Sequence, residues 1–192
     1  GAKMIAKKYK LAFLSSGLLY RYASYLILKH QPKNKLSFLK KKFKKLNYKS
    51  LNKINLHSPR ISQNSAVIAK NNEIRKILKK FQIDFSKKYK NCCIEGRDIS
   101  TKILPNSDVK FFFKCNLDTA ARRRYKELKK RGVKINFKSV KKALKLRNIS
   151  DKKRKYSPLK KHKNAVIVDT KKLNKQAMLK KMIKHVERVL NN

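Results

Sequence analysis

Two groups of arginine and carboxylate residues are the part of this 192-residue sequence whose types and spacing could do chemistry. The first, Glu95-Gly96-Arg97-Asp98, directly follows a short apolar run that is typical of a strand. The second consists of Arg147, Asp151 and Arg154 in a segment with helical periodicity. Arginine forks bind phosphate oxygens, and carboxylates accept hydrogen bonds from sugar hydroxyls or an exocyclic amine. Together these groups predict a nucleotide pocket, and hence an enzyme acting on a small phosphorylated molecule.

The spacing of the second group places its side chains on one helix face. At about 100° per residue, Asp151 and Arg154 are offset from Arg147 by about +40° and about −20°. An exposed ion-pair ladder, which contributes a few tenths of a kcal/mol, would have the same spacing. We favour a binding role for this group over an exposed ladder, because the chain has only 10 acidic residues and Asp151 falls between two arginines. Ser157-Pro158 ends the segment, as expected for a mobile flap.

The charge balance by itself suggests a different class of partner. The chain has 55 Lys+Arg against 10 Asp+Glu, a formal net charge of +45 and a pI near 10.6. Such a balance is typical of proteins that bind nucleic acid or anionic membranes. Here the basic residues are mostly lysines that run along almost the whole chain, which a coding bias toward AT-rich codons would also produce. We therefore expect neither a specific nucleic-acid partner nor a membrane partner.

The length of the chain, its apolar runs and its cysteines limit further which class of protein it can be. The 192 residues, 41% of them hydrophobic, can bury one substantial core. The chain has no run of eighteen or more apolar residues, so no segment is expected to span a bilayer. Lysines interrupt the apolar stretches of the first ten residues, which is not the pattern of a signal peptide. Cys92, Cys93 and Cys115 fit neither a disulfide framework nor a metal spacing, so no metal ligands are predicted. A cytoplasmic location follows as the expectation.

The order of elements predicts an α/β fold with a mostly parallel sheet. Continuous apolar runs, which fit strands covered on both faces, occur at 11–14, 92–94, 109–113 and 165–168. Helical patterns occur at 18–28, 62–81, 117–131, 136–150 and 174–190, with a loosely helical stretch at 32–53. A turn is expected at Ser15-Ser16-Gly17.

Two polar segments are predicted to share one edge of the sheet. Ligands of such sheets bind beyond the carboxyl ends of the strands, and Ser15-Ser16-Gly17 and Gly96-Arg97-Asp98 each follow a strand. Arg21, one turn into the next helix, alone would be an ordinary surface residue. Beside Ser16, Gly17 and Tyr20 it becomes a candidate phosphate ligand.

A run of three arginines, Arg122, Arg123 and Arg124, lies in the helical pattern that begins near Asp118. Successive residues span most of a helical circumference, so the three cannot all face one ligand, and at least one is expected to be solvated. Gly132 is a reasonable stop for this helix.

From Ser16 to its end, the chain resembles bacterial cytidylate kinase, a nucleoside monophosphate kinase of the P-loop class. The matching segments, in chain order, are Ser16-Gly17-Leu18-Leu19-Tyr20-Arg21, Glu95-Gly96-Arg97-Asp98-Ile99, Pro105-Asn106-Ser107-Asp108-Val109-Lys110, Ala121-Arg122-Arg123-Arg124-Tyr125-Lys126-Glu127-Leu128, Lys134-Ile135-Asn136-Phe137, Arg147 with Asp151, Arg154 and Ser157-Pro158-Leu159, and Ala165-Val166-Ile167-Val168-Asp169-Thr170. Each segment is short, but their order and spacing are jointly specific. The resemblance is strongest at 92–170 and poor at 30–60.

The resemblance implies a P-loop NTPase-like three-layer α/β/α fold and Mg²⁺-assisted transfer of the ATP γ-phosphoryl group to CMP or dCMP. It assigns Arg21, Arg97 and Arg154 to the acceptor phosphate, Asp98 to cytosine, Arg147 and Asp151 to the sugar, and Ser16, Gly17 and Tyr20 to the substrate site. Arg122 and Arg123 would belong to a lid at about 119–156 that closes over the ATP phosphates. The implied core is 1–29 and 85–192, with a monophosphate-binding insertion at 30–84 in a monomer. The three guanidinium groups at 21, 97 and 154 should then converge on one anion.

The chain also departs from the family pattern. The first strand and the glycine-rich phosphate loop should precede Ala2-Lys3, so the sequence predicts an amino-terminally truncated chain that is inactive alone. Ser15 replaces an aspartate, Ala66 a pocket serine, and Ile83 an arginine that follows Gln82. Three alternatives stay open: a kinase for another nucleoside monophosphate, a non-catalytic relative, and a basic RNA- or ribosome-binding protein.

Overall fold

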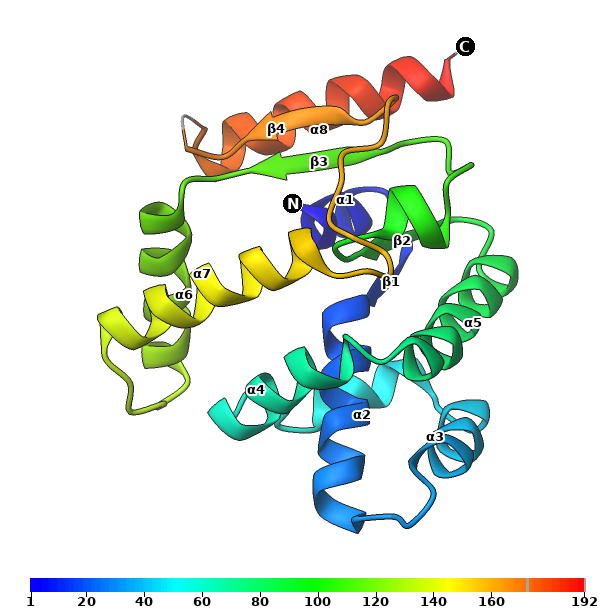
Figure 1. Ribbon diagram of the computed structural model, residues 1–192. Coiled ribbons are helices and arrows are strands. Elements are labelled where there is room, and N and C mark those ends of the chain that lie inside the picture. The colour runs from blue at the N-terminus through cyan, green and yellow to red at the C-terminus, as the bar shows by residue number, and fades with distance from the viewer. Residues whose placement is uncertain (172, 192) are drawn as a thin grey trace. The chain divides into compact units, whose positions relative to one another are not determined.

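The computed structural model describes residues 1–171 and 173–191 as a helix-rich α/β protein (Figure 1). The chain divides into two compact units. One contains Ala2 and residues 6–99, and is called here the amino-terminal unit. The other contains Gly1, Lys3–Ile5 and the residues from Ser100 onward, and is called the carboxyl-terminal unit. The core, lid and insertion expected from the sequence stay predictions, because these units do not test that division.

A parallel pair of strands organises the amino-terminal unit. β1 (Ala12–Ser15) pairs with β2 (Cys92–Glu95) in a register that sets Ala12 opposite Cys92 and Ser15 opposite Glu95. Both strands were predicted, and their parallel pairing places their carboxyl ends at one edge. Before β1, α1 (Ala2–Lys8) contributes to both units.

The turn expected at 15–17 is wrong, because helix α2 (Ser16–His30) begins directly after the strand. Ser15 is at once the last residue of β1 and the N-cap of α2, with extended backbone angles of φ −99° and ψ 111°. A β-region N-cap followed by helical residues needs no intervening turn. Ser16 and Gly17 therefore occupy the first turn of the helix.

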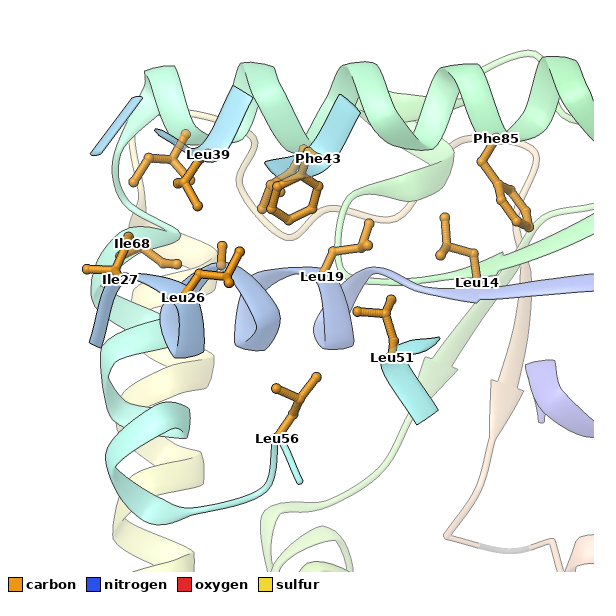
Figure 2. Close-up of a cluster of buried hydrophobic side chains, with 13 residues drawn as sticks. Leu14, Leu19, Leu26, Ile27, Leu39, Phe43, Leu51, Leu56, Ile68 and Phe85 are labelled. Carbon is orange, nitrogen blue, oxygen red and sulfur yellow. The ribbon is translucent and has the colours of Figure 1, made fainter. Parts of the chain in front are cut away.

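Between α2 and β2, a helical segment builds the core of the amino-terminal unit. It contains α3 (Lys35–Lys44), the 3₁₀ turn η1 (Tyr48–Lys53), α4 (Pro59–Ile68) and α5 (Asn72–Lys88). α4 packs on α2, and α3 packs on α5. Figure 2 shows the buried side chains that these elements share, among them Leu14, Leu19, Leu39, Leu56 and Phe85. Each such leucine contributes about 1.5–3 kcal/mol by leaving water, so this apolar cluster stabilises the elements on which the candidate site depends.

The single helix expected at 62–81 is two helices. α4 begins three residues earlier than expected, where the Ser58 side chain accepts a hydrogen bond from the Ile61 amide and Pro59 occupies the first helical position. The break lies at 69–71, where the Asn71 side chain caps α5 by accepting from the Ile74 amide at 3.0 Å. Both caps satisfy amides that a helix start leaves unpaired. The apolar stripe continues across this break, so periodicity alone predicted a single helix.

The second parallel pair belongs to the carboxyl-terminal unit. β3 (Phe111–Lys114) pairs with β4 (Val166–Asp169), with Phe111 opposite Val166 and Lys114 opposite Asp169. β3 starts two residues later than predicted. It ends at Lys114, so Cys115 lies just beyond it. α8 (Lys175–Leu190) lies along this pair, where His185 contacts the Phe111 ring at 5.6 Å between centroids (Figure 1). The expected parallel α/β class is confirmed, as two two-stranded sheets within the described residues.

Two further helices connect β3 to β4. α6 (Leu117–Lys130) and α7 (Phe137–Lys153) pack on each other, and the Tyr125 and Phe137 rings meet edge to face. α6 ends near Gly132, which has a positive φ of 71° and donates its amide to the Lys129 carbonyl, as expected from the sequence. A short π-helical turn, η2 (Ile99–Ile103), precedes β3. Within 1–171 and 173–191, no helix is both long and apolar enough to cross a membrane.

Candidate active site

The loop after β2 and the first turn of α2 lie against each other. The register brings Ser15 opposite Glu95, so Ser16 and Gly96 follow the two strands at the same level. A Cβ on Gly96 would lie only 2.9 Å from the Cβ of Ser16, which measures how closely the two backbones approach. The expectation that both segments share one edge of the sheet is confirmed. This edge, formed by Ser16, Gly17 and 96–98, is called the strand-end rim below.

Asp98 is the acid of the rim, and only 4% of its surface is exposed. Its Oδ2 accepts from Nη2 of Arg75 at 2.5 Å, and both side chains are almost completely buried. Arg75 also donates from Nη1 to the Ala69 carbonyl at 3.0 Å. Its guanidinium carbon lies 5.6 Å from the centre of the Tyr20 ring. Arg75 therefore connects two predicted substrate residues, Tyr20 and Asp98.

Sequence reasoning missed Arg75, although a signal was present. Arg75, Leu78, Gln82 and Phe85 are spaced 3, 4 and 3 residues apart, and all four are buried on one face of α5. An arginine within an apolar stripe must have a partner, because an unpaired buried charge is strongly destabilising. With 10 acids in the chain, the candidates for that partner were few.

The two arginines that were predicted to bind the acceptor phosphate in this unit, Arg21 and Arg97, are half-buried. Arg21 lies on α2, and its Nη1 is 3.4 Å from Nδ1 of His57, in the segment before α4. Arg97 follows Gly96 in the rim. Their expected role as acceptor-phosphate ligands stays a prediction.

Arg147, Asp151 and Arg154 form an ion-pair group in the carboxyl-terminal unit. Nη1 of Arg154 donates to Oδ1 of Asp151 at 2.9 Å, and Nε of Arg147 lies 3.8 Å from Oδ2 of the same carboxylate. Asp151 is 7% exposed, whereas the Arg147 side chain is 39% exposed. The sequence-based expectation that these residues lie together is confirmed.

The expectation that Arg154 lies on the helix is wrong. α7 ends at Lys153, and Arg154 is its C-cap with extended backbone angles of φ −62° and ψ 140°. Its Nε donates to the Ser157 carbonyl at 2.6 Å, and the Leu159 amide donates to the Asp151 carbonyl at 2.7 Å. The chain therefore folds back after α7, and this return fixes the Arg154 side chain beside Asp151. Arg21 and Arg97 belong to the other unit, so convergence of the three arginines on one anion stays a prediction.

The arginine run on α6 divides as the helix geometry requires. Arg123 donates from Nη1 to the Thr170 hydroxyl at 3.1 Å and from Nη2 to the Thr170 carbonyl at 2.8 Å. Arg124 pairs with Glu127 at 2.8 Å, and Arg122 is exposed. The three side chains thus point to different surroundings, as predicted. Arg123 therefore joins α6 to the residue that follows β4. Its expected contact with ATP phosphates, like that of Arg122, stays a prediction.

One thiol on β2 has a perturbed pKa. Desolvation raises the pKa of Cys93 to about 11, and the neighbouring Glu95 and Cys92 add to the effect. The Cys93 thiol is also 3.6 Å from the Ala2 carbonyl oxygen. A neutral thiol at that pKa is a packing group and not a nucleophile. Among the residues that the structure describes, no group of three or more His, Cys, Asp or Glu side chains could hold a metal ion.

The helix-rich α/β architecture, with its two parallel strand pairs, is that of a P-loop NTPase-like fold. The family model for cytidylate kinase matches residues 2–188, and the chain belongs to this family. It is 36% identical over 181 residues to a cytidylate kinase of Bartonella tribocorum, covering 92% of this chain and 82% of the relative. It is 35% identical over 182 residues to one of Clostridium botulinum strain Hall, covering 88% and 82%. A Clostridium tetani cytidylate kinase is 32% identical over 198 residues, covering 97% and 87%.

Proposed function

We propose that the protein transfers the γ-phosphoryl group of ATP to CMP or dCMP, as its family and its relatives' names suggest. The observation that supports this most strongly is the family match over residues 2–188, which includes every predicted site residue. The rim and the Arg147–Asp151–Arg154 group supply the guanidinium and carboxylate groups that a nucleotide needs. Phosphoryl transfer depends on positioned oxygens and neutralised charge, with little covalent chemistry from protein.

Each predicted residue has a role in this proposal. Arg21, Arg97 and Arg154 hold the acceptor phosphate, because planar guanidinium groups bind its oxygens bidentately. Asp98 accepts a hydrogen bond from the cytosine amine, and Arg147 with Asp151 contacts the sugar. Ser16, Gly17 and Tyr20 complete the substrate side of the rim, and Arg122 and Arg123 close over the donor phosphates.

The ATP phosphates and Mg²⁺ belong to the same proposal. The described residues offer no carboxylate cluster for the ion, which fits a Mg²⁺ held mainly by substrate phosphates and water. When bound, Mg²⁺ neutralises charge on the transferring phosphoryl group. The 192 residues contain four glycines and no glycine-rich loop, so the contacts of such a loop are no part of the site described here. The proposal also includes that the protein is a monomer, that it acts in the cytoplasm, and that its partners are small-molecule nucleotides.

The test is ADP release by the full-length protein with CMP, dCMP, UMP and AMP as acceptors. We expect the highest kcat/KM with CMP or dCMP, and loss of turnover when Mg²⁺ is chelated. Arg97→Met should lower kcat/KM for CMP about tenfold or more, since a charge-assisted hydrogen bond contributes about 1.5–3 kcal/mol. Lys90→Met, an exposed position before β2, is the matched control. A faster rate with another nucleotide, or no turnover with any of them, would overturn the proposal.

The net charge of +45 supports one alternative, a basic RNA-binding protein. Nonspecific attraction between a basic chain and RNA weakens steeply with salt, because neutralised phosphates release counterions. RNA binding that persists as the salt concentration rises would therefore indicate more than this attraction. A titration with a labelled RNA at 50 and 200 mM salt, with and without CMP, distinguishes the two functions. Tight binding at both salt concentrations, without any effect of CMP, would favour the RNA-binding function.

A further inference from the structure

The end of α2 and the whole of α3 concentrate positive charge in a segment that the candidate active site does not use. The chain has no acidic residue before Glu73, so α2, α3, η1 and α4 carry basic side chains and no acidic ones. A coding bias toward AT-rich codons favours lysine over arginine. It does not remove Glu and Asp, because their codons GAA and GAT contain the same share of A and T as the arginine codon AGA. The family resemblance is also poor at 30–60, so phosphoryl transfer does not account for this charge.

The exposed face of α3 consists mainly of lysines. Leu39 and Phe43 bury the opposite face of the helix in the apolar cluster. The exposed lysines of this helix are Lys35, Lys40, Lys41, Lys42 and Lys44. Several of them are three or four positions apart, and like charges at this spacing repel each other and destabilise a helix. A bound polyanion would relieve this repulsion.

The acids of the neighbouring helix do not neutralise the lysines of α3. α3 packs on α5, which carries Glu73 and Asp84. Glu73 pairs with Lys76 at 2.8 Å and Asp84 pairs with Lys80 at 3.3 Å, in both cases on α5 itself. The lysines of α3 therefore present an excess of positive charge to solvent.

Aromatic rings are interleaved with these lysines. His30, the last residue of α2, is exposed, and its ring centroid lies 5.4 Å from that of the half-buried Phe38 on α3. The Lys42 ammonium is 5.5 Å from the centre of the Phe38 ring, and the Lys29 ammonium is 5.7 Å from that of Tyr25. A single-stranded nucleic acid fits such a surface, because its phosphates bind cations and its bases stack on aromatic faces.

We propose that this surface binds single-stranded RNA without sequence preference, as a second activity beside phosphoryl transfer. It is called here the lysine surface, and it comprises Lys29, His30 and Phe38 with the lysines at 40–42 and 44. The lysines bind phosphates, and the His30–Phe38 pair stacks on a base. A membrane fits less well, because the apolar side chains of α3 are buried in the core and cannot enter a bilayer. RNA is the partner rather than DNA, since it is the nucleic acid that cells hold largely in single-stranded form.

The experiment measures binding of a labelled uridine oligonucleotide of about 20 residues at 50 and 200 mM salt. The α3 variant replaces three exposed lysines of the surface: Lys40→Gln, Lys41→Gln and Lys44→Gln. Its control replaces three exposed lysines with the same spacing on α8: Lys180→Gln, Lys181→Gln and Lys184→Gln. Each lost contact with a single strand lowers the slope of log K against log salt by about 0.7. The α3 variant should therefore lose about 2 from this slope and bind about tenfold or more weakly, whereas the α8 variant should stay within twofold.

The outcomes separate a defined RNA surface from diffuse charge and from other anions. Equal losses in the two triple variants, or no loss in either, would overturn the proposal. His30→Ala should weaken RNA binding about fivefold or more, because a stacking ring is lost, and should leave binding of an inorganic polyphosphate of similar charge within twofold. An equal effect on both polymers, or an effect on neither, would overturn the assignment to RNA. Vesicles containing phosphatidylserine that displace the RNA at equal charge concentration would overturn it as well.

Folding of the α3 variant is checked by thermal unfolding. We expect it to fold, because glutamine removes the repulsion between the lysines. Should it fail to fold, acetylation of the wild type replaces it: bound RNA should slow acetylation of Lys41 at least threefold more than that of Lys181, and equal protection would overturn the proposal. CMP phosphorylation by the α3 variant should match the wild type, because its substituted residues lie outside the candidate active site. Failure of the proposed function is visible separately, as a wild type that binds RNA at the lysine surface without turning over CMP.

Discussion

Replacing Gly96 by alanine tests the contact that builds the strand-end rim. The added Cβ would lie 2.8 Å from both Cγ1 and Cδ1 of Ile99, and 2.9 Å from the Cβ of Ser16. The end of the Ile99 side chain can rotate away, but the Ser16 Cβ is tied to the backbone of α2 and buried. Extra atoms in a packed site cost about 1–3 kcal/mol, so we expect Gly96→Ala to lower the free energy of unfolding by about that amount.

Gly17→Ala is the matched control, from the same rim and with the opposite expected sign. The nearest atom to a Cβ at 17 is the Ser15 hydroxyl oxygen at 3.7 Å, an ordinary contact. Gly17 is helical, and glycine within a helix is less stable than alanine by about 0.5–1 kcal/mol. Gly17→Ala should therefore raise the free energy of unfolding, or leave it unchanged.

Thermal unfolding measured by circular dichroism separates the two variants. For a chain of this size, about 1 kcal/mol shifts Tm by about 2–4 °C, so Gly96→Ala should melt about 2–12 °C below the wild type. Its KM for CMP should also rise, since the alanine displaces Arg97 and Asp98 from Ser16. A Gly96→Ala protein that melts with the wild type, or equal losses for both alanines, would refute the argument from close packing.

Three more predictions concern other parts of the chain. Arg154→Met should lower kcat/KM for CMP about 10- to 100-fold by removing charge-assisted hydrogen bonds, with the exposed Lys153→Met as the control in the same assay; equal losses would contradict it. A pKa near 11, against an ordinary 9.0, lowers the thiolate fraction of Cys93 at pH 8 about a hundredfold, so mass spectrometry should show iodoacetamide modifying the exposed Cys115 first. Faster modification of Cys93 would show that the thiol is not buried. Ile83→Arg, which introduces the arginine of the family pattern, should raise the CMP-to-UMP ratio of kcat/KM, and an unchanged ratio would count against the base site proposed here.

The strands and most helices followed from local patterns because those patterns carry the periodicity of the elements. Short apolar runs predicted the four strands to within about two residues, and β1 and β4 begin one residue after their predicted starts. The helices after β3 were equally clear, since α6, α7 and α8 begin within one residue of their predicted starts. The strand-end rim was also predictable, because parallel strands carry their carboxyl ends to one edge.

The predictions of secondary structure were wrong where a helix cap or a change of chain direction interrupts an element although the residue periodicity continues. The apolar stripe at 62–81 continues across the break at Asn71, so periodicity alone could not show that two helices share it. Arg154 satisfied the spacing of a helix face, yet it lies beyond the end of α7. Its position beside Asp151 comes from the hydrogen bonds of the returning chain, which link residues 151 and 159.

The sequence by itself determined the parallel α/β class, the family and the chemical types of the site residues, because periodicity and motif spacing are local properties of the chain. Only the tertiary structure decided which acid pairs with which base. Asp98 was recognised as a candidate reader of the base, but its partner Arg75 lies 23 positions earlier, on a helix whose stripe otherwise reads as core. Burial selects that partner, since a carboxylate removed from water must meet a donor brought to it by folding.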